Sequence, residues 1–184
     1  GLYYRAAALS HICRFISNYH VENGRLPVSI WNKVAFFPGT FDPFTLSHKG
    51  IVRAIRDMGY EVYLAIDEFS WSKNTQPHLV RRQIVSMSVA DMFHVHLFPD
   101  EIPVNIANPS DLARLKAVFP GREVYLVVGS DVIAGASAYT APPRENSVHN
   151  MNHIVFRRAS QSEREVDHQR DPKDFITGKV VELE

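Results

Sequence analysis

The sequence predicts an α/β fold in which helices cover both faces of a parallel β-sheet. Short apolar runs bounded by turn-forming residues alternate with longer stretches whose apolar residues recur at helical spacing. The apolar runs are mostly continuous, as expected for strands that are buried on both faces. Alternating strands and helices connect by right-handed crossovers into a parallel sheet, and 184 residues suffice for one such domain.

The first expected element is a helix over residues 1–20. Its apolar side chains recur every three or four positions and would form one stripe: Leu2, Ala6, Leu9, Cys13 and Ile16. Gly24 and Pro27 then end the helix. Residues 1–32 are therefore expected to form a helical extension, and residues 33–184 the α/β domain.

The first strand is expected in the run "NKVAFFPG" (32–39), because an apolar stretch ends there in a Pro-Gly turn. A helix with one apolar face follows over 47–58, and "YEVYLAID" (60–67) is the second strand. After a polar loop, helical spacing returns over 79–92.

The rest of the chain continues this alternation. A fourth helix is expected over 109–119, opened by Pro109 with Ser110 or Asp111 as its cap. The charged stretch at 159–175 should be a solvated loop. The remaining strands are expected at residues 93–99, 123–131, 152–158 and 178–184. Because the sequence ends in a strand, we expect the domain to be truncated at its C-terminus.

Composition excludes some classes of function. Lys and Arg number 20, as do Asp and Glu, so no basic surface argues for binding to nucleic acid or to an anionic membrane. No run of about 18 apolar residues could span a membrane. Cys13 is the only cysteine and cannot form an internal disulfide, which fits a reducing, cytoplasmic location.

The loop after the first strand is the best candidate for a ligand site, because ligands of parallel sheets bind beyond the carboxyl ends of the strands. Neither glycine-rich phosphate motif, G-x-x-x-x-G-K-[ST] or G-x-G-x-x-G, is present. Gly39 nevertheless allows close backbone approach, and the following helix offers free N–H groups. Thr45 and His48 could both point at a phosphate there, or Asp42, Thr45 and Ser47 could simply cap the turn.

The stretch "PGTFDPFTLSH" resembles the first signature of a nucleotidyltransferase superfamily, a G-x-F-D-P loop followed by [HT]-x-G-H. Ser47 stands where that family usually has Gly. The resemblance is closest to nicotinate or nicotinamide mononucleotide adenylyltransferases and implies their Rossmann-like fold. Pro38 and Thr45 are more similar to the phosphopantetheine adenylyltransferase version of the loop. The family's second signature, I-S-S-T-x-[RK], is absent from the sequence.

The resemblance also implies site residues. His48, with Thr45 beside it, would contact the reacting phosphoryl group, and the nucleotide would lie against residues of four stretches: Gly39, Thr40, Phe41, Asp42, Lys73, Arg82, Gly129 and Asp131. Phe41 could equally pack in the core, Asp42 would fix the loop, Lys73 could be a solvated lysine, and Asp131 could be a helix cap. Arg81 is the better surface candidate of the two arginines.

Four aromatic or histidine positions complete the set. Tyr139 falls where these enzymes usually place a Trp that stacks on the pyridine ring. Trp71 could be a lid aromatic or cover the edge of the core. His94 and His96 face one side of a strand and, without a nearby Cys or acidic partner, are expected to be structural.

The implied reaction is transfer of AMP from ATP to a pyridine mononucleotide in NAD biosynthesis, with release of pyrophosphate. Mg²⁺ would arrive with ATP, without a protein ligand set. Two alternatives remain: another phosphate acceptor such as phosphopantetheine or a CTP-dependent reaction, and a nucleotide-binding module without turnover. A homo-oligomer is possible.

Overall fold

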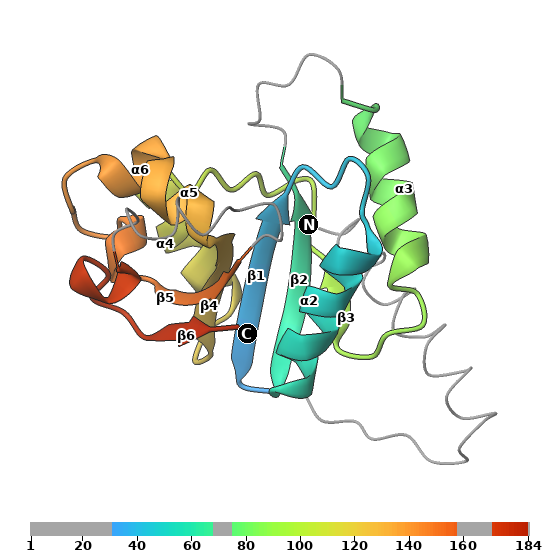
Figure 1. The fold of residues 1–184 in the computed structure, drawn as a ribbon, viewed down its shortest axis with the longest axis horizontal. Helices are drawn as coiled ribbons and strands as arrows, with labels where there is room; N and C mark the ends of the chain where they lie inside the picture. Colours follow the sequence, from blue (N-terminus) through green and yellow to red (C-terminus); the bar gives the residue numbers. More distant parts are fainter. Residues whose placement is uncertain (1–30, 68–74, 158–170, 184) are drawn as a thin grey trace. The chain divides into compact units, whose positions relative to one another are not determined.

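The computed structural model describes residues 31–67, 75–157 and 171–183. Its centre is a six-stranded sheet with the strand order β3-β2-β1-β4-β5-β6 (Figure 1). The strands are β1 (Lys33–Gly39), β2 (Tyr60–Ile66), β3 (Val95–Leu97), β4 (Glu123–Gly129), β5 (Asn152–Phe156) and β6 (Val180–Glu182). The pairs β1–β4, β2–β3, β4–β5 and β5–β6 are parallel. This confirms the expected Rossmann-like parallel sheet; the helix expected over 1–20 lies outside the described residues.

The helices follow the strands along the chain. They are α2 (Leu46–Asp57), α3 (His78–Ser88), α4 (Pro109–Val118), α5 (Ser130–Gly135), α6 (Ser137–Thr140) and the 3-10 turns η1 (Val148–Asn150) and η2 (Pro172–Asp174). The short helices α5 and α6 lie in a part of the chain for which the sequence predicts no helix. Within the residues that the structure describes, no helix combines the length and the hydropathy that crossing a membrane requires.

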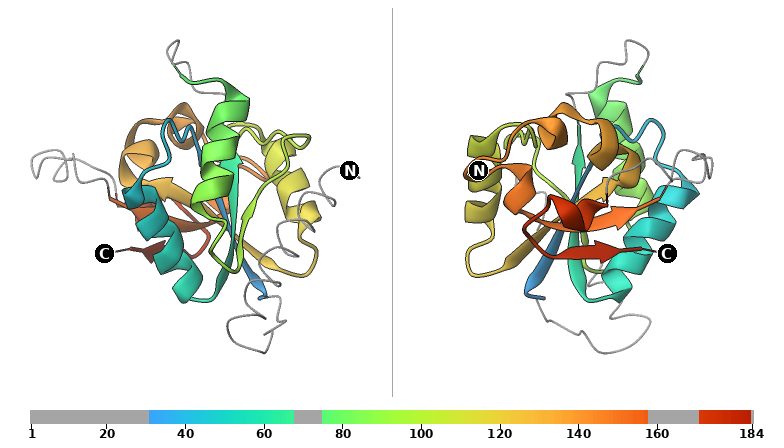
Figure 2. Two further views of the ribbon diagram at one scale, coloured as in Figure 1. Left: turned by 90° about the vertical axis from the view of Figure 1, so that its right-hand side faces the viewer. Right: turned by 60° about the vertical axis from the view of Figure 1, so that its left-hand side comes forward.

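The chain divides into two compact units, Gly1–Asn32 with Pro38–Ile102, and Lys33–Phe37 with Pro103–Glu184. In the first unit, α2 and α3 both pack on β2 (Figure 2, left). The helix α3 ends before the expected 92, because Val89 and Met92 are buried by the turn that follows it rather than by the helix. Apolar spacing therefore continues past the end of the helix.

A buried carboxylate joins the beginnings of β2 and β3. The oxygens of Glu61 accept hydrogen bonds from His94 Nδ1 at 2.5 Å and from His96 Nε2 at 2.8 Å. Burial alone would raise the pKa of Glu61, but the hydrogen bonds from His96 and His94 outweigh it and hold the pKa below its usual range. The expectation that the two histidines lack an acidic partner is therefore wrong. The ring of Trp31 stacks on His94, with 3.6 Å between ring centroids.

In the second unit, the sheet continues through β4, β5 and β6, and Figure 2 (right) shows β5 and β6 side by side. Their close approach depends on Gly178, just before β6. A Cβ atom at this position would lie 2.2 Å from the carbonyl oxygen of Met151, so no larger residue fits without a backbone shift.

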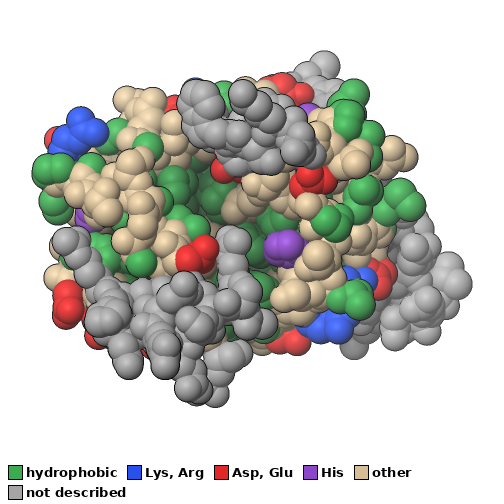
Figure 3. Space-filling model, turned by 45° about the horizontal axis from the view of Figure 1, so that its top comes forward, with side chains coloured by type: hydrophobic (Ala, Val, Ile, Leu, Met, Phe, Trp, Pro, Cys, Tyr) green, Lys and Arg blue, Asp and Glu red, His purple; other side chains and the backbone are tan. Residues whose placement is uncertain are grey.

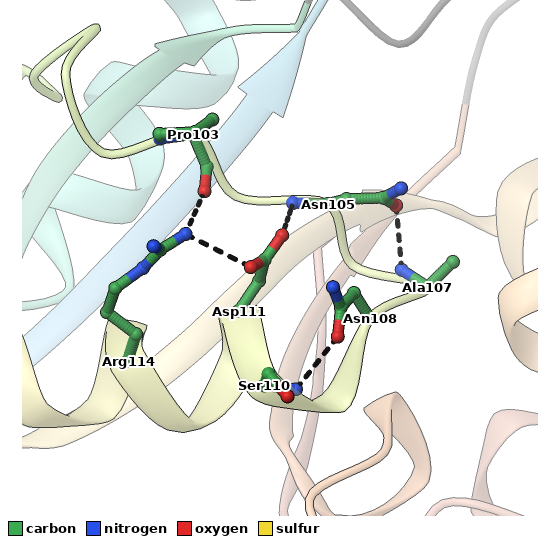
Figure 4. A network of polar contacts seen from close by, with 7 residues as sticks. All are labelled: Pro103, Asn105, Ala107, Asn108, Ser110, Asp111 and Arg114. Carbon is green, nitrogen blue, oxygen red and sulfur yellow. Dashed lines mark hydrogen bonds and ion pairs between the residues drawn. The ribbon is translucent and has the colours of Figure 1, made fainter.

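The start of α4 is fixed by a polar network in the same unit (Figure 4). The cap is Asn108, whose Oδ1 accepts from the Ser110 N–H at 3.0 Å, rather than Ser110 or Asp111 as expected. Asp111 instead accepts from the backbone N–H of Asn105 and forms an ion pair with Arg114. Arg114 also donates to the carbonyl oxygen of Pro103 at 2.6 Å, so the segment leading into the helix is tied to its second turn.

The side chains on the face drawn in Figure 3 are mainly hydrophobic or uncharged, with Lys and Arg scattered among them. That distribution agrees with the formal net charge of zero. Within the described part of this face, no extended basic surface is visible.

Candidate functional site

The loop between β1 and α2 is built around the ring of Phe41. Phe41 is buried, and its backbone has a φ of 49°, in the left-handed region that a bulky residue seldom adopts. Its ring folds back over Gly39, where a Cβ atom would meet ring carbons at 2.7 Å. The ring therefore packs in the core of the loop, and Gly39 is required by this contact. The Asp42–Pro43 peptide bond is cis.

Thr45 and His48 form a reciprocal cap at the start of α2. The backbone N–H of His48 donates to Thr45 Oγ1 at 3.3 Å, and the backbone N–H of Thr45 donates to His48 Nδ1 at 3.0 Å. This is the arrangement of a capping box with His in the place of Glu. Because Nδ1 accepts a hydrogen bond, the proton of the neutral ring is on Nε2. The cap therefore leaves His48 with an N–H donor at Nε2.

Two aromatic rings hold the imidazole of His48 in place. Phe44 stacks on it with an interplanar angle of 20°, and Phe41 meets it edge-on at 88°, each with ring centroids 5.4 Å apart. Both phenylalanines are buried, whereas His48 is half-buried. The ring orientation is consequently set by packing as well as by the cap.

The loop is tied to α3 and to the segment before it through the side chains of Asp42 and Arg81. Asp42 Oδ2 accepts from the backbone N–H of Gln76 at 3.1 Å. Arg81 donates from Nη1 to the carbonyl oxygen of Thr40 and from Nε to that of Gln76, both at 2.9 Å. Four residues thus hold the two segments together, with the guanidinium of Arg81 between them.

The two arginines of α3 lie in different surroundings, and one of them departs from its expected place. Arg81, expected at the surface, is only 6% exposed and faces the loop, which corrects that expectation. Arg82 is half-buried, and its Nη1 donates to Phe98 O at 3.2 Å and pairs with Asp100 at 2.9 Å. The sequence contains the signal for this: Arg81 falls four residues before Val85, on the buried stripe of the helix.

The charge of Arg81 has no counter-charge among the described residues. Its guanidinium donates to backbone carbonyl oxygens, and no carboxylate of residues 31–67, 75–157 or 171–183 forms an ion pair with it. Burying a cation without an anion is costly, so such a position favours an anionic ligand. Lys73 and Trp71 lie outside the described residues.

In the second unit, Gly129 ends β4 and is the residue before α5. Asp131 lies in the first turn of α5 and is half-buried. A carboxylate in this position interacts favourably with the helix N-terminus. The contact between Asp131 and a nucleotide that the sequence suggests stays a prediction.

Tyr139 lies in α6 and is 2% exposed. Its hydroxyl donates to His153 Nε2 at 2.9 Å, while His153 Nδ1 donates to the carbonyl oxygen of Met151 at 2.7 Å. Burial raises the pKa of the Tyr139 hydroxyl and lowers that of His153 to about 4, so both groups are neutral. In this conformation the ring of Tyr139 has no exposed face for stacking on a ligand, contrary to the expected role.

The described side chains were expected to include no set of metal ligands, and their arrangement bears on which ligands the site can hold. Among residues 31–67, 75–157 and 171–183, no group of three or more His, Cys, Asp or Glu has an arrangement suited to a metal ion. The donors assembled at the loop after β1 are instead N–H groups: His48 Nε2, the Arg81 guanidinium and the N-terminus of α2. Such a set is suited to phosphate oxygens.

Comparison with known proteins was informative only at the level of structure. No family model and no curated protein sequence matches the chain. Solved structures do match. Nicotinic acid mononucleotide adenylyltransferase of Plasmodium falciparum, complexed with NaAD, has a TM-score of 0.60 at 16% identity, over 83% of this chain and 75% of that one.

Two further structures agree with the first. The same Plasmodium falciparum enzyme complexed with APC gives a TM-score of 0.57 at 15% identity, over 83% of this chain and 75% of that one. A protein of Vibrio parahaemolyticus assigned as a nicotinate-nucleotide adenylyltransferase gives 0.54 at 16% identity, over 73% of this chain and 78% of that one. Identities this low establish the fold alone: the chain has the Rossmann-like α/β fold of these nicotinate mononucleotide adenylyltransferases.

Proposed function

We propose that the protein is a nucleotidyltransferase that transfers AMP from ATP to nicotinate or nicotinamide mononucleotide. A phosphate oxygen of the mononucleotide attacks the α-phosphorus of ATP, the bond from that phosphorus to the bridging oxygen breaks, and pyrophosphate leaves. No covalent enzyme intermediate is required, so the protein contributes positioning and stabilisation of charge.

The observation that carries the proposal is the Thr45–His48 cap. It turns the Nε2–H of His48 into a fixed donor at the N-terminus of a twelve-residue helix that directly follows a strand end. A hydrogen-bond donor at such a place stabilises negative charge that develops on phosphoryl oxygens. The likeness in fold to adenylyltransferases supports the same assignment.

Arg81 has a second role in the proposal. By bonding the carbonyl oxygen of Thr40, it holds the loop against α3, and its uncompensated charge attracts the triphosphate to this side of the loop. Mg²⁺ would arrive bound to the phosphate oxygens of ATP. Since no suitable ligand set occurs among the described residues, we assign no step to a metal held by the protein.

The test is a pyrophosphate-release assay with ATP, Mg²⁺ and nicotinate mononucleotide. His48→Ala should reduce turnover by at least about a hundred-fold, as removal of a fixed donor to the transition state does. Lys49→Ala is the matched control, because Lys49 is the next residue of α2 and pairs with Asp91 instead. Equal turnover of the His48→Ala and Lys49→Ala variants would sink the assignment of His48.

A different phosphate acceptor is the second candidate, and the buried Tyr139 favours it. An acceptor without a pyridine ring needs no stacking partner there. Replacing the mononucleotide with 4′-phosphopantetheine in the same assay, and ATP with CTP in a parallel series, separates these substrates. Turnover with only one pair identifies the reaction, and nucleotide binding without pyrophosphate release from any pair indicates a module without turnover.

A further inference from the structure

The cap at the start of α2 fixes the protonation of His48 as well as its orientation. The backbone N–H of Thr45 donates to Nδ1 at 3.0 Å, and the Thr45 hydroxyl oxygen lies 2.9 Å from the same atom. A backbone amide can only donate, so Nδ1 must supply a lone pair. The two contacts therefore require a ring without a proton on Nδ1.

The residue type at this position is unusual for a capping box. The ordinary residue three places after the cap is Glu or Gln. In α2 it is His, and the first turn contains no acidic residue: Leu46, Ser47 and His48. Glu would accept the Thr45 N–H equally well, but its negative charge would repel an anion at the same helix end. The neutral imidazole caps the helix without adding this charge.

We propose that the cap and the anion contact hold together only while His48 is neutral, so that acid weakens binding at this site. This role of His48 rests on the proposed function, in which Nε2–H donates to a phosphoryl oxygen. A protonated ring has an N–H at both nitrogens, and Nδ1–H would face the Thr45 N–H, one donor against another. The ring then leaves the cap, and the ligand loses its fixed donor.

The opposite expectation is that acid strengthens the site, since an imidazolium attracts phosphate more than a neutral ring does. Two features of the structure oppose it. A cation is unfavourable at the N-terminus of a helix, which already carries partial positive charge. The place of the ring beside Phe41 and Phe44 is also the one in which Nδ1 meets the Thr45 N–H, so a ring that leaves the cap leaves these contacts as well.

The charged side chains near the loop have other partners. Asp42 accepts from a backbone N–H of the segment before α3, and Arg81 donates to backbone carbonyl oxygens. Lys49, the next residue of α2, pairs with Asp91. All four groups are unchanged when His48 is replaced, so comparison with a variant at this position isolates the titration of His48.

Two substitutions separate the acceptor of the cap from the donor to the ligand. His48→Gln keeps both, because a side-chain amide accepts through its oxygen, donates through its nitrogen and does not titrate. His48→Glu keeps only the acceptor. In urea unfolding at pH 8, both variants should unfold at a higher urea concentration than His48→Ala, which cannot complete the cap. Equal midpoints for all three variants would overturn the proposal.

Calorimetry with Mg²⁺-ATP measures binding of the anion. At pH 8, His48→Glu should bind at least about ten-fold more weakly than His48→Gln, because it replaces a donor with a negative charge. Between pH 8 and pH 5.5, the unaltered protein should lose at least about three-fold more affinity than His48→Gln, in which ATP titrates identically. Absence of binding by the unaltered protein, or an affinity that falls no more than that of His48→Gln, would overturn the proposal.

Nitrogen-15 NMR of the unliganded protein tests the cap without reference to the reaction. The signals of His48 are those missing from His48→Gln, and at pH 8 they should show the proton on Nε2. A proton on Nδ1 would contradict the proposal. If no substrate pair releases pyrophosphate while the NMR and calorimetry results are as expected, the proposed transferase activity fails, but the coupling between the cap and the bound anion is supported.

Discussion

His153 should make the stability of the protein fall in mild acid. Its imidazole is fully buried and neutral, because Nδ1–H donates to Met151 O and Nε2 accepts from the Tyr139 hydroxyl. Burial lowers its pKa from 6.5 to about 4. In the unfolded chain the ring titrates near its ordinary value, so between these two pH values only the unfolded state binds the proton.

The sign and size of the effect follow from this difference. The contribution of His153 is complete above about pH 6.5 and is lost as the pH falls toward 4. Relative to pH 8, the loss at pH 5 is about 2 kcal/mol in the free energy of unfolding. Glu61 acts in the same direction at lower pH, because its pKa is held below its usual range in the folded state.

The contribution of His153 to the pH dependence of stability can be isolated by urea unfolding. The unaltered protein and the His153→Gln variant are each unfolded at pH 8 and at pH 5. The unaltered protein should lose about 2 kcal/mol more than the variant between the two pH values, since every other titrating group is common to both. The variant should be less stable at pH 8 by about 1–3 kcal/mol, because the Tyr139 hydroxyl loses its partner. An identical pH dependence in both proteins, or an NMR titration of His153 near pH 6.5, would refute the buried neutral ring.

Three further outcomes are expected. Arg81→Met should lower turnover at least about ten-fold by releasing the loop after β1, whereas Arg82→Met should change it less than about three-fold in the same assay. In urea unfolding, Gly178→Ala should cost about 3 kcal/mol or prevent folding through its backbone clash. Its control Gly50→Ala, which meets nothing within 4 Å inside α2, should stabilise by about 0.5–1 kcal/mol. Thr45→Val should cost about 1 kcal/mol by removing the cap of α2, and a stability equal to that of the unaltered protein would contradict the capping box.

The order of strands and helices could be predicted because it depends on local patterns. Continuous apolar runs identified the strands of the sheet, and turn residues such as those around Gly121 delimited them. The short helices α5 and α6 could not be recognised, because four or six residues contain too little periodicity. The cap of α4 was misplaced because Asn108, Ser110 and Asp111 are all good cap residues, and only the backbone path selects one of them.

The candidate site was less accessible to sequence reasoning, because its contacts join residues far apart in the chain. Thr45 and His48 could be paired from their spacing on one helix. Arg81 and Thr40, by contrast, are 41 residues apart in the sequence and meet only in the folded chain, and no local pattern indicates this. The burial of Tyr139 could not be predicted, because a helix of four residues gives no indication of which side is buried.

The cap that starts α2 also determines which kind of hydrogen bond the His48 side chain can make with a ligand. With its Nδ1 lone pair engaged by a backbone N–H, the neutral ring of His48 can give a hydrogen bond outward but cannot receive one. An oxyanion can therefore accept a hydrogen bond from this ring, whereas an ammonium group or a metal cation finds no lone pair on it. In the proposed function, the hydrogen bond that begins the helix would thus also make His48 favour anionic ligands over cationic ones.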